Sequence, residues 1–333
     1  MNLSKEALPA YLKRKKLSQR EALTVRQIGD GQKNLIYHVS DSEETWLIKQ
    51  ALSRVQIKER WWVDRRRVFA EKTCIEILAQ ILPPDVIPDI ILEDRTDFIL
   101  VTTPPPKDAV WWEEDLNRGR IDLQIAVQCG ELLATVHNET IDKPDLLALF
   151  KDTKAFEQLR LEPFYGKVGQ AFPDLKKIID NQARNLLKNR RTLVLGDLRP
   201  RNVWINAGQV YLVDFATVHF GNPSFDLALY SADLCIRAMR NSIQKAAYLE
   251  AVNVFWNAYF RMGEYDGKEE TEKSAVRDLG CLLLSATDGR LPTANLPPET
   301  ENLARRIAQS LLFTELNRIE DITEFVNRTL IDG

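Results

Sequence analysis

The sequence predicts an α+β protein of two lobes, a small one built on an antiparallel sheet and a larger, mainly helical one. Before residue 102, short β-branched or aromatic runs alternate with Gly, Asn, Asp and Ser, which is typical of strands. From Leu123 onward, apolar residues recur at helical spacing. Three prolines, Pro104 to Pro106, separate the two patterns. We therefore expect an N-terminal lobe at residues 1–103 and a C-terminal lobe at 104–333, each able to bury its own core.

The elements of the N-terminal lobe follow from local patterns. Three strands of an antiparallel meander are expected at residues 22–28, 34–39 and 45–50. A helix follows over 64–82, with further strands at 86–92 and 98–101. The apolar side of the helix is formed by Val68, Cys74, Ile75 and Leu78. Its polar side carries Glu71 and the run Arg65, Arg66 and Arg67, which we expect to be a solvated face.

The C-terminal lobe is expected to be helical apart from one β hairpin. The segment PPPKDAVWWEED, residues 104–115, is expected to be a connector, because its prolines cannot continue a strand or a helix. The helix that begins at Leu123 has an apolar stripe of Ile125, Cys129, Leu132, Leu133 and Val136. Asn206-Ala207-Gly208 predicts the hairpin turn. Further helices are expected at 226–242, 245–263, 270–285 and 299–329, the last broken near Asn317.

Composition excludes several classes of function. The net charge of −3 arises from 45 basic and 48 acidic residues, so no positive field favours nucleic acid as a partner. No apolar run reaches about 18 residues, so we expect no membrane-spanning segment. The four cysteines are scattered without a C-x-x-C pair, which favours reduced core residues in a cytoplasmic protein. An enzyme acting on a small molecule fits best, and the oligomeric state stays open.

One stretch, LVLGDLRPRNVWINAGQVYLVDF at residues 193–215, sets polar residues among apolar strands. Buried carboxylates are costly unless they are paired or bind a metal. Asp197 supplies a base, and Asn202 and Asp214 supply oxygen ligands for a hard cation such as Mg²⁺. Phosphoryl transfer needs an oriented hydroxyl and a metal held against the phosphates, and these residue types meet that need.

GDLRPRN followed by VDF resembles the catalytic loop and metal-binding segment of the aminoglycoside phosphotransferase and choline kinase superfamily, relatives of protein kinases. GNPSFDLA resembles the element that follows them. The resemblance implies a protein-kinase-like fold in which Asp197 is the catalytic residue and Asn202 and Asp214 bind magnesium. Asp226 would be the structural aspartate that braces the catalytic loop.

The resemblance continues in the N-terminal lobe, where IGDGQKNLIYHV and TWLIKQAL are similar to methylthioribose kinase. It implies that Gly29 and Gly31 form a short loop over the phosphates and that Lys49 contacts them. Glu71 is the expected ion-pair partner of Lys49, with Glu76 as the second choice.

Residues 99–104, including Val101 and Thr102, would form the hinge that meets adenine. ATP and Mg²⁺ are therefore the expected cofactors, and a hydroxyl of a small molecule is the acceptor. A sugar, an amino alcohol or an aminoglycoside are all conceivable, with a lean toward a sugar.

Two positions depart from the family pattern. Leu195 replaces the histidine that usually precedes the Gly-Asp pair, a change that bears on loop geometry more than on chemistry. Arg199 stands where relatives carry His or Ser, and it would donate to the transferring phosphoryl group; otherwise it is a solvent-facing loop residue.

Other readings stay open. A nucleotide-binding pseudokinase with a regulatory role is the main alternative, and a protein kinase is weaker because no A-P-E element follows VDF. The pairs Trp61-Trp62 and Trp111-Trp112 favour a packing role in which one ring is buried and the other partly exposed. His137 is expected to be a satisfied structural histidine.

Overall fold

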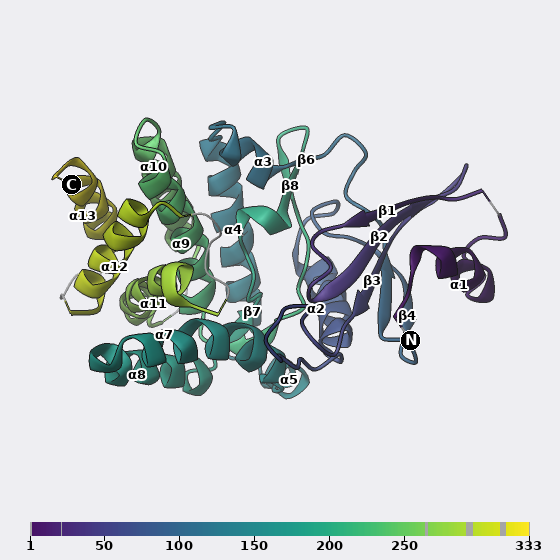
Figure 1. Cartoon of the computed structure of the whole chain (residues 1–333), viewed down its shortest axis with the longest axis horizontal. Helices are drawn as coiled ribbons and strands as arrows, with labels where there is room; N and C mark the ends of the chain where they lie inside the picture. Colours follow the sequence, from purple (N-terminus) through teal and green to yellow (C-terminus); the bar gives the residue numbers. More distant parts are fainter. Residues whose placement is uncertain (1, 21, 264–265, 291–295, 314–317, 333) are drawn as a thin grey trace. The chain divides into compact units, whose positions relative to one another are not determined.

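The computed structural model describes residues 2–20, 22–263, 266–290, 296–313 and 318–332. The chain forms two compact units, Met1–Ala109 and Val110–Gly333 (Figure 1). This boundary lies after the Pro104–Pro106 segment, whereas the boundary expected from the sequence lay just before it.

The first unit is a five-stranded antiparallel sheet with two α-helices. The sheet has the order β1-β2-β3-β5-β4 and consists of β1 (Thr24–Ile28), β2 (Asn34–Ser40), β3 (Thr45–Ala51), β4 (Ile90–Asp94) and β5 (Ile99–Thr102). The helices are the 3-10 turn η1 (Lys5–Ala7) with α1 (Leu8–Arg14), and α2 (Arg67–Ile81). The strand expected from residue 86 begins only at Ile90, since Pro88 has no N–H to donate to a neighbouring strand.

The two faces of the sheet carry different helices (Figure 1). Leu8 and Leu12 of α1, a helix that the sequence did not predict, join Trp46 and Ile48 of β3 in one buried cluster. Because strand side chains alternate between faces, Lys49 points the other way, toward α2. The sheet register thus puts Lys49 on the α2 side of β3.

The expectation of a solvated arginine face on α2 is wrong for two of its three residues. Arg67 is only 3% exposed. Arg65 donates from Nε to the carbonyl oxygen of Ala51 at 2.9 Å, and its guanidinium lies over the ring of Phe98. Only Arg66 is a surface residue, with a side chain 64% exposed. Charge alone did not predict burial, because a guanidinium can be satisfied by backbone carbonyl groups.

The second unit is mainly helical. The elements that the sequence predicted in outline are α4 (Leu123–Thr140), β8 (Val203–Asn206), β9 (Gln209–Leu212), α9 (Ser224–Arg240), α10 (Lys245–Met262), α11 (Lys268–Asp288), α12 (Pro298–Phe313) and α13 (Ile319–Asp332). The expected break at Asn317 lies outside the described residues. The β8–β9 turn is Ala207-Gly208, with φ of 47° and 77°, the positive values of a two-residue hairpin turn.

Several elements of this unit were not predicted. They are α5 (Pro144–Leu149), α6 (Lys154–Phe156), the π-helix η2 (Glu157–Gly166), α7 (Lys167–Ala171), the 3-10 turn η3 (Pro173–Leu175), α8 (Lys176–Lys188), β7 (Thr192–Val194), the 3-10 turn η4 (Pro200–Asn202) and β10 (His219–Gly221). The connector is shorter than expected: residues 104–109 contain no helix or strand, but β6 (Val110–Trp111) pairs with β8, and α3 (Trp112–Asn117) follows it.

Close packing of α4 against α10 supports the middle of this unit. A side chain at Gly130 of α4 would overlap the carbonyl oxygen of Phe255, so only glycine fits between the two backbones. Central helix α9 is buried along most of its length. Its first turn contains the buried Asp226, which contacts the loop of the candidate site.

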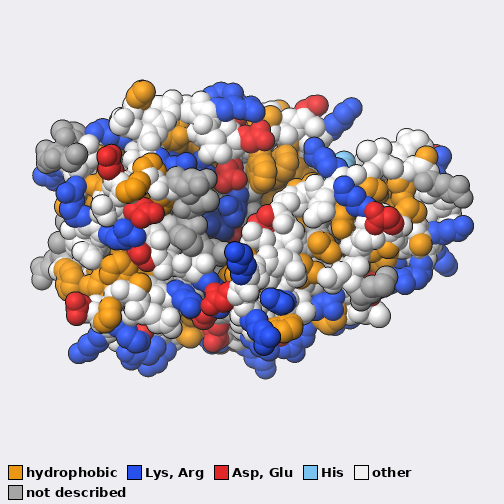
Figure 2. All heavy atoms as spheres, in the orientation of Figure 1, with side chains coloured by type: hydrophobic (Ala, Val, Ile, Leu, Met, Phe, Trp, Pro, Cys, Tyr) orange, Lys and Arg blue, Asp and Glu red, His pale blue; other side chains and the backbone are white. Residues whose placement is uncertain are grey.

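All four cysteines are buried and none of them is in a disulfide, as predicted. In the part of the chain that the structure describes, none of the helices has the length and apolarity needed to cross a bilayer. Figure 2 shows Lys and Arg interspersed with Asp and Glu on the face in view, consistent with the nearly balanced composition.

Candidate active site

Lys49 and Glu71 form a buried ion pair in the first unit. Lys49 Nζ lies 2.9 Å from Oε1 and 2.8 Å from Oε2 of Glu71. The pair is the one expected from the sequence. Glu76, the second choice, instead pairs with Lys72 on the outer side of α2. A lysine held this way presents its charge at a fixed place on the sheet.

The Gly29-Asp30-Gly31 turn joins β1 to β2. Gly29 and Gly31 have φ of 73° and 66°, values that L-residues with side chains rarely adopt. Asp30 Oδ1 accepts from the backbone N–H of Gln32 at 2.9 Å and closes the turn. A Cβ at Gly29 would meet nothing within 4 Å, so its glycine serves backbone conformation and not packing.

Val101 and Thr102, the proposed adenine contacts, are both buried at the end of β5. Val101 is opposite Ile48 of β3 and Thr102 is opposite Leu47. The sheet therefore fixes their backbone, and their contact with a nucleotide remains a prediction.

The loop that carries Asp197 is anchored by Asp226. Its two carboxylate oxygens accept hydrogen bonds of 2.7 Å from the backbone N–H groups of Leu195 and Gly196. This is the bracing contact expected of Asp226. The loop is therefore held through the backbone of Leu195, a contact that does not need the histidine side chain that the family pattern has at this position.

His137 supports the same carboxylate from α4. Its Nε2 lies 3.5 Å from Oδ2 of Asp226, and its Nδ1 shares a hydrogen bond of 2.9 Å with the Tyr259 hydroxyl. The histidine is fully buried. It is thus a structural histidine, as predicted, but it is satisfied only at Nδ1, because Nε2 has no hydrogen-bond partner among the described residues.

Asp197 is held by two guanidinium groups. Arg160 Nη2 lies 2.8 Å from Oδ2 of Asp197, and Arg199 Nε lies 2.6 Å from Oδ1. Asp197 is 8% exposed. Two adjacent cations favour the ionised carboxylate, the form that can orient a hydroxyl and accept its proton.

Arg160 is a site residue that the sequence reasoning missed. It comes from the π-helix η2, and its Nε donates to the carbonyl oxygen of Gly196 at 2.8 Å. Burial lowers the pKa of this guanidinium, while the charge of Asp197 opposes that effect. Glu157, Gln158 and Glu162 lie beside Arg160 in the sequence, so no local apolar run indicated that it is buried.

Arg199 is not a solvent-facing loop residue. Its side chain is 17% exposed and paired with Asp197. Burial works against its charge, but the carboxylates of Asp197 and Asp233 outweigh that effect and raise the pKa of Arg199. It is therefore a permanent cation beside the candidate base, and its contact with a phosphoryl group remains a prediction.

Asn202 and Asp214 lie on neighbouring segments. Asn202 Nδ2 donates to the backbone carbonyl oxygen of Asp197 at 2.9 Å. The backbone carbonyl oxygen of Asn202 accepts from the N–H of Val213 at 3.0 Å. Asp214 follows with φ of 66°, an uncommon value for a residue other than glycine. The donor role of Nδ2 leaves the Asn202 amide oxygen available as a ligand, and an amide oxygen and a carboxylate are donor types that Mg²⁺ accepts; binding of the ion by Asn202 and Asp214 remains a prediction.

The tryptophan pairs have the burial that the sequence favoured. Trp61 is buried and Trp62 is 62% exposed. Trp112 is fully buried, whereas the partly exposed Trp111 stacks on Trp204 with ring centroids 5.6 Å apart. Both pairs are explained by packing.

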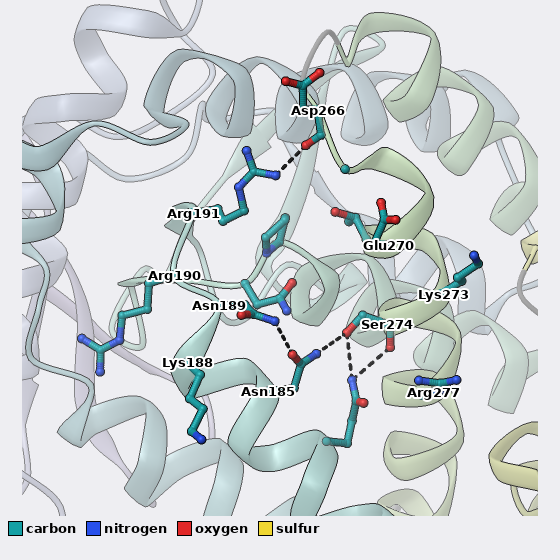
Figure 3. A pocket seen from close by; sticks show the side chains of 15 residues that line it. Asn185, Lys188, Asn189, Arg190, Arg191, Asp266, Glu270, Lys273, Ser274 and Arg277 are labelled. Atoms are coloured by element: carbon teal, nitrogen blue, oxygen red, sulfur yellow. Dashed lines mark hydrogen bonds between the residues drawn. The ribbon is translucent and has the colours of Figure 1, made fainter.

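A separate polar cavity of about 740 Å³ lies in the second unit between α8 and the start of α11 (Figure 3). Gln182 Nε2 and Asn185 Nδ2 both donate to Ser274 Oγ at 2.9 Å, and Arg191 Nη1 donates to the carbonyl oxygen of Asp266 (Figure 3). The residues that line it include none of the predicted site residues. We therefore do not assign catalysis to this cavity, although it is large.

Comparisons with known proteins agree on the family. The model of the phosphotransferase enzyme family matches residues 24–265. Methylthioribose kinase of Bacillus cereus (strain B4264) is 24% identical over 84% of this chain and 82% of its own length. The enzyme of the same name from Geobacillus kaustophilus is 23% identical over 71% of this chain and 67% of its own length.

Solved structures share the fold at low identity. Amicoumacin kinase in complex with AMP-PNP, Ca²⁺ and Ami has a TM-score of 0.60 at 14% identity, over 97% of this chain and all of its own. A choline/ethanolamine kinase family protein from Mesorhizobium loti has a TM-score of 0.53 at 14% identity, over 97% and 99% of the two chains. The expected kinase-like fold is confirmed. The chain therefore belongs to the phosphotransferase enzyme family and is a kinase of small molecules.

Proposed function

We propose that the protein uses ATP and Mg²⁺ to phosphorylate a hydroxyl group of a small molecule in the cytoplasm. The observation that carries the proposal is the cluster around Asp197: a carboxylate fixed by Arg160 and Arg199, beside Asn202 and Asp214. An ion-paired carboxylate next to two oxygen ligands is the arrangement that phosphoryl transfer needs.

In the proposed reaction Asp197 orients the acceptor hydroxyl and accepts its proton. The acceptor oxygen forms a bond to the γ-phosphorus while the bond from that phosphorus to the bridging oxygen breaks, and ADP leaves. Arg199 stabilises the negative charge on the phosphoryl oxygens, because its guanidinium already lies at the base. Bound magnesium, held by Asn202 and Asp214, would neutralise phosphate charge.

In the first unit, Lys49 would contact the nucleotide phosphates from β3. Glu71 restrains its ammonium group, and the positive φ of Gly29 and Gly31 shapes the turn whose backbone N–H groups would meet the phosphates. Val101 and Thr102 would meet adenine through the backbone of β5. These roles follow the family resemblance, and the ion pair and the glycine conformations support them.

A sugar is the acceptor class that we favour. The support is the similarity to methylthioribose kinases over most of both chains, at 22–24% identity. The structures of amicoumacin and choline kinases share the fold at 14–15% identity, and this similarity does not favour one class of acceptor over another.

The deciding experiment is magnesium-dependent ATP turnover against methylthioribose, choline, an aminoglycoside and a metabolite extract, with products identified by mass spectrometry. A product heavier by one phosphate that disappears with Asp197→Asn supports the proposal. Nucleotide binding without turnover across the extract would instead support a regulatory module that retains the fold.

A further inference from the structure

Arg67 is buried where β2 begins and β3 ends. Its Nη2 donates to the carbonyl oxygen of Lys33 at 2.6 Å, to Oδ1 of Asn34 at 3.0 Å and to the carbonyl oxygen of Leu52 at 3.0 Å. Its Nη1 donates to the carbonyl oxygen of Asp64 at 2.8 Å. One rigid, planar group thus connects three separate segments of the first unit.

Two of these segments adjoin the proposed phosphate-binding elements. Lys33 and Asn34 are the chain that leaves the Gly29-Asp30-Gly31 turn, and Leu52 follows closely after Lys49. The two segments are also joined directly, because the N–H of Leu52 donates to the carbonyl oxygen of Lys33 at 3.1 Å. The guanidinium therefore fixes the exit of the glycine turn relative to the strand that carries the lysine.

The same helix also fixes the lysine side chain. Glu71 is four residues after Arg67, so the two side chains lie on one face of α2. Both are less than 5% exposed. One face of α2 thereby holds the glycine turn through Arg67 and the ammonium of Lys49 through Glu71.

We propose that Arg67 is a positioning residue for the phosphates of the bound nucleotide, an inference that rests on the proposed function. Arg67 acts through the backbone of Lys33 and Leu52, and it sets the distance between the turn and Lys49. Groups that are held in place before binding lose less entropy when phosphate binds. The hydrogen bonds given above for Arg67 run to Lys33, Asn34, Leu52 and Asp64 and not to Val101 or Thr102, so we expect adenosine recognition to be independent of it.

The test compares the affinities for Mg-ATP and for adenosine by calorimetry. Arg67→Gln should raise the Kd for ATP about tenfold and that for adenosine less than twofold. Arg67→Lys should lose less ATP affinity than Arg67→Gln, because lysine keeps the charge and part of the hydrogen bonding. The matched control is Arg66→Gln, which removes the same charge from an exposed neighbour paired with Asp64 and should change neither affinity.

A second variant guards against misfolding of the first. Asn34→Ala removes one acceptor and leaves Arg67 with its three backbone carbonyl partners, and we expect a two- to threefold loss of ATP affinity, roughly the effect of weakening one hydrogen bond. Equal losses for ATP and adenosine, or unchanged ATP affinity in both Arg67→Gln and Asn34→Ala, would overturn the inference.

The same measurements distinguish a failure of the proposed function from a failure of the positioning role of Arg67. Wild-type protein that binds ATP no more tightly than adenosine would remove the function and the inference together. A wild-type preference for ATP over adenosine that is unchanged in size in Arg67→Gln would remove only the positioning role.

Discussion

Arg160 Nη2 lies 2.8 Å from Oδ2 of Asp197, and the same guanidinium donates from Nε to the carbonyl oxygen of Gly196 at 2.8 Å. A single arginine from a π-helix thus holds both the carboxylate and the backbone of the catalytic loop. Because Arg199 occupies the other carboxylate oxygen, the orientation of Asp197 is fixed from two directions. Loss of either arginine should therefore lower turnover. Loss of Arg160 should disturb the orientation of Asp197, whereas loss of Arg199 should remove a positive charge from beside the phosphoryl group.

Arg160→Met should lower kcat by about 100-fold while the Kd for ATP stays within twofold, because Asp197 loses its orientation but the nucleotide contacts remain. The free energy of unfolding should fall by about 2 kcal/mol, since a buried carboxylate loses one charged donor. Steady-state kinetics and chemical denaturation measure the two effects.

Guanidinium ion at millimolar concentration provides the control for Arg160. It should restore part of kcat in Arg160→Ala, whose side chain leaves room for it, and have no such effect on the exposed Arg184→Ala. An Arg160→Met enzyme with wild-type kcat would show that the pair serves the fold alone.

Arg199→Ala should lower kcat by roughly 100-fold or more, because a preorganised donor at developing charge contributes about 2 to 4 kcal/mol. ATP affinity should change only a few-fold. Arg199→Lys should recover part of the loss, since it keeps the charge without the planar fork. Single-turnover rates on the three proteins decide the matter, and equal rates would leave charge stabilisation to Lys49 and magnesium.

Asp214→Asn should abolish the magnesium dependence of ATP binding with little change in the melting temperature. Asparagine tolerates the φ of 66° at this position, so the backbone is preserved while the anionic ligand is lost. Calorimetry with and without Mg²⁺ measures the effect. A melting temperature that drops sharply in the absence of nucleotide would instead make Asp214 a structural residue.

Stability should depend little on pH between 4 and 6.5, because two buried groups act in opposite directions. Burial raises the pKa of Asp278 to about 7, so the folded state binds its proton more tightly and stability falls as pH rises toward 7. Burial lowers the pKa of His219 to about 4, so stability from this group increases as pH rises from 4 to 6.5.

Asp278→Asn removes the titrating carboxyl group, and with it the fall in stability as pH rises. The asparagine has the same shape and can still form hydrogen bonds with Tyr165 and Ser224. The unfolding free energy of the variant should then rise with pH between 4 and 6.5, by a few kcal/mol at most. Urea denaturation at several pH values measures this. A slope equal to that of the wild type would mean that Asp278 is not protonated in the folded protein.

The sequence by itself determined the parts of the site that depend on short-range geometry. Asp197, Asn202 and Asp214 lie on one loop and hairpin, whose spacing is set by η4 and by the β8–β9 register. Lys49 was expected from the resemblance of TWLIKQAL to methylthioribose kinase, and the strand predicted at residues 45–50 is present as β3. Helices with a clear apolar period, such as α4 and α9, were expected close to their observed positions.

Only the tertiary structure decided which distant side chains complete the site. Residues 144–171 fold into short helices and a π-helix containing Pro163, where no regular apolar period identifies a buried face. Arg160 reaches Asp197 through the packing of that region, and Arg67 is buried because carbonyl groups from three segments meet around it. A buried guanidinium depends on where its partners converge in space, and that convergence has no signature in the local sequence.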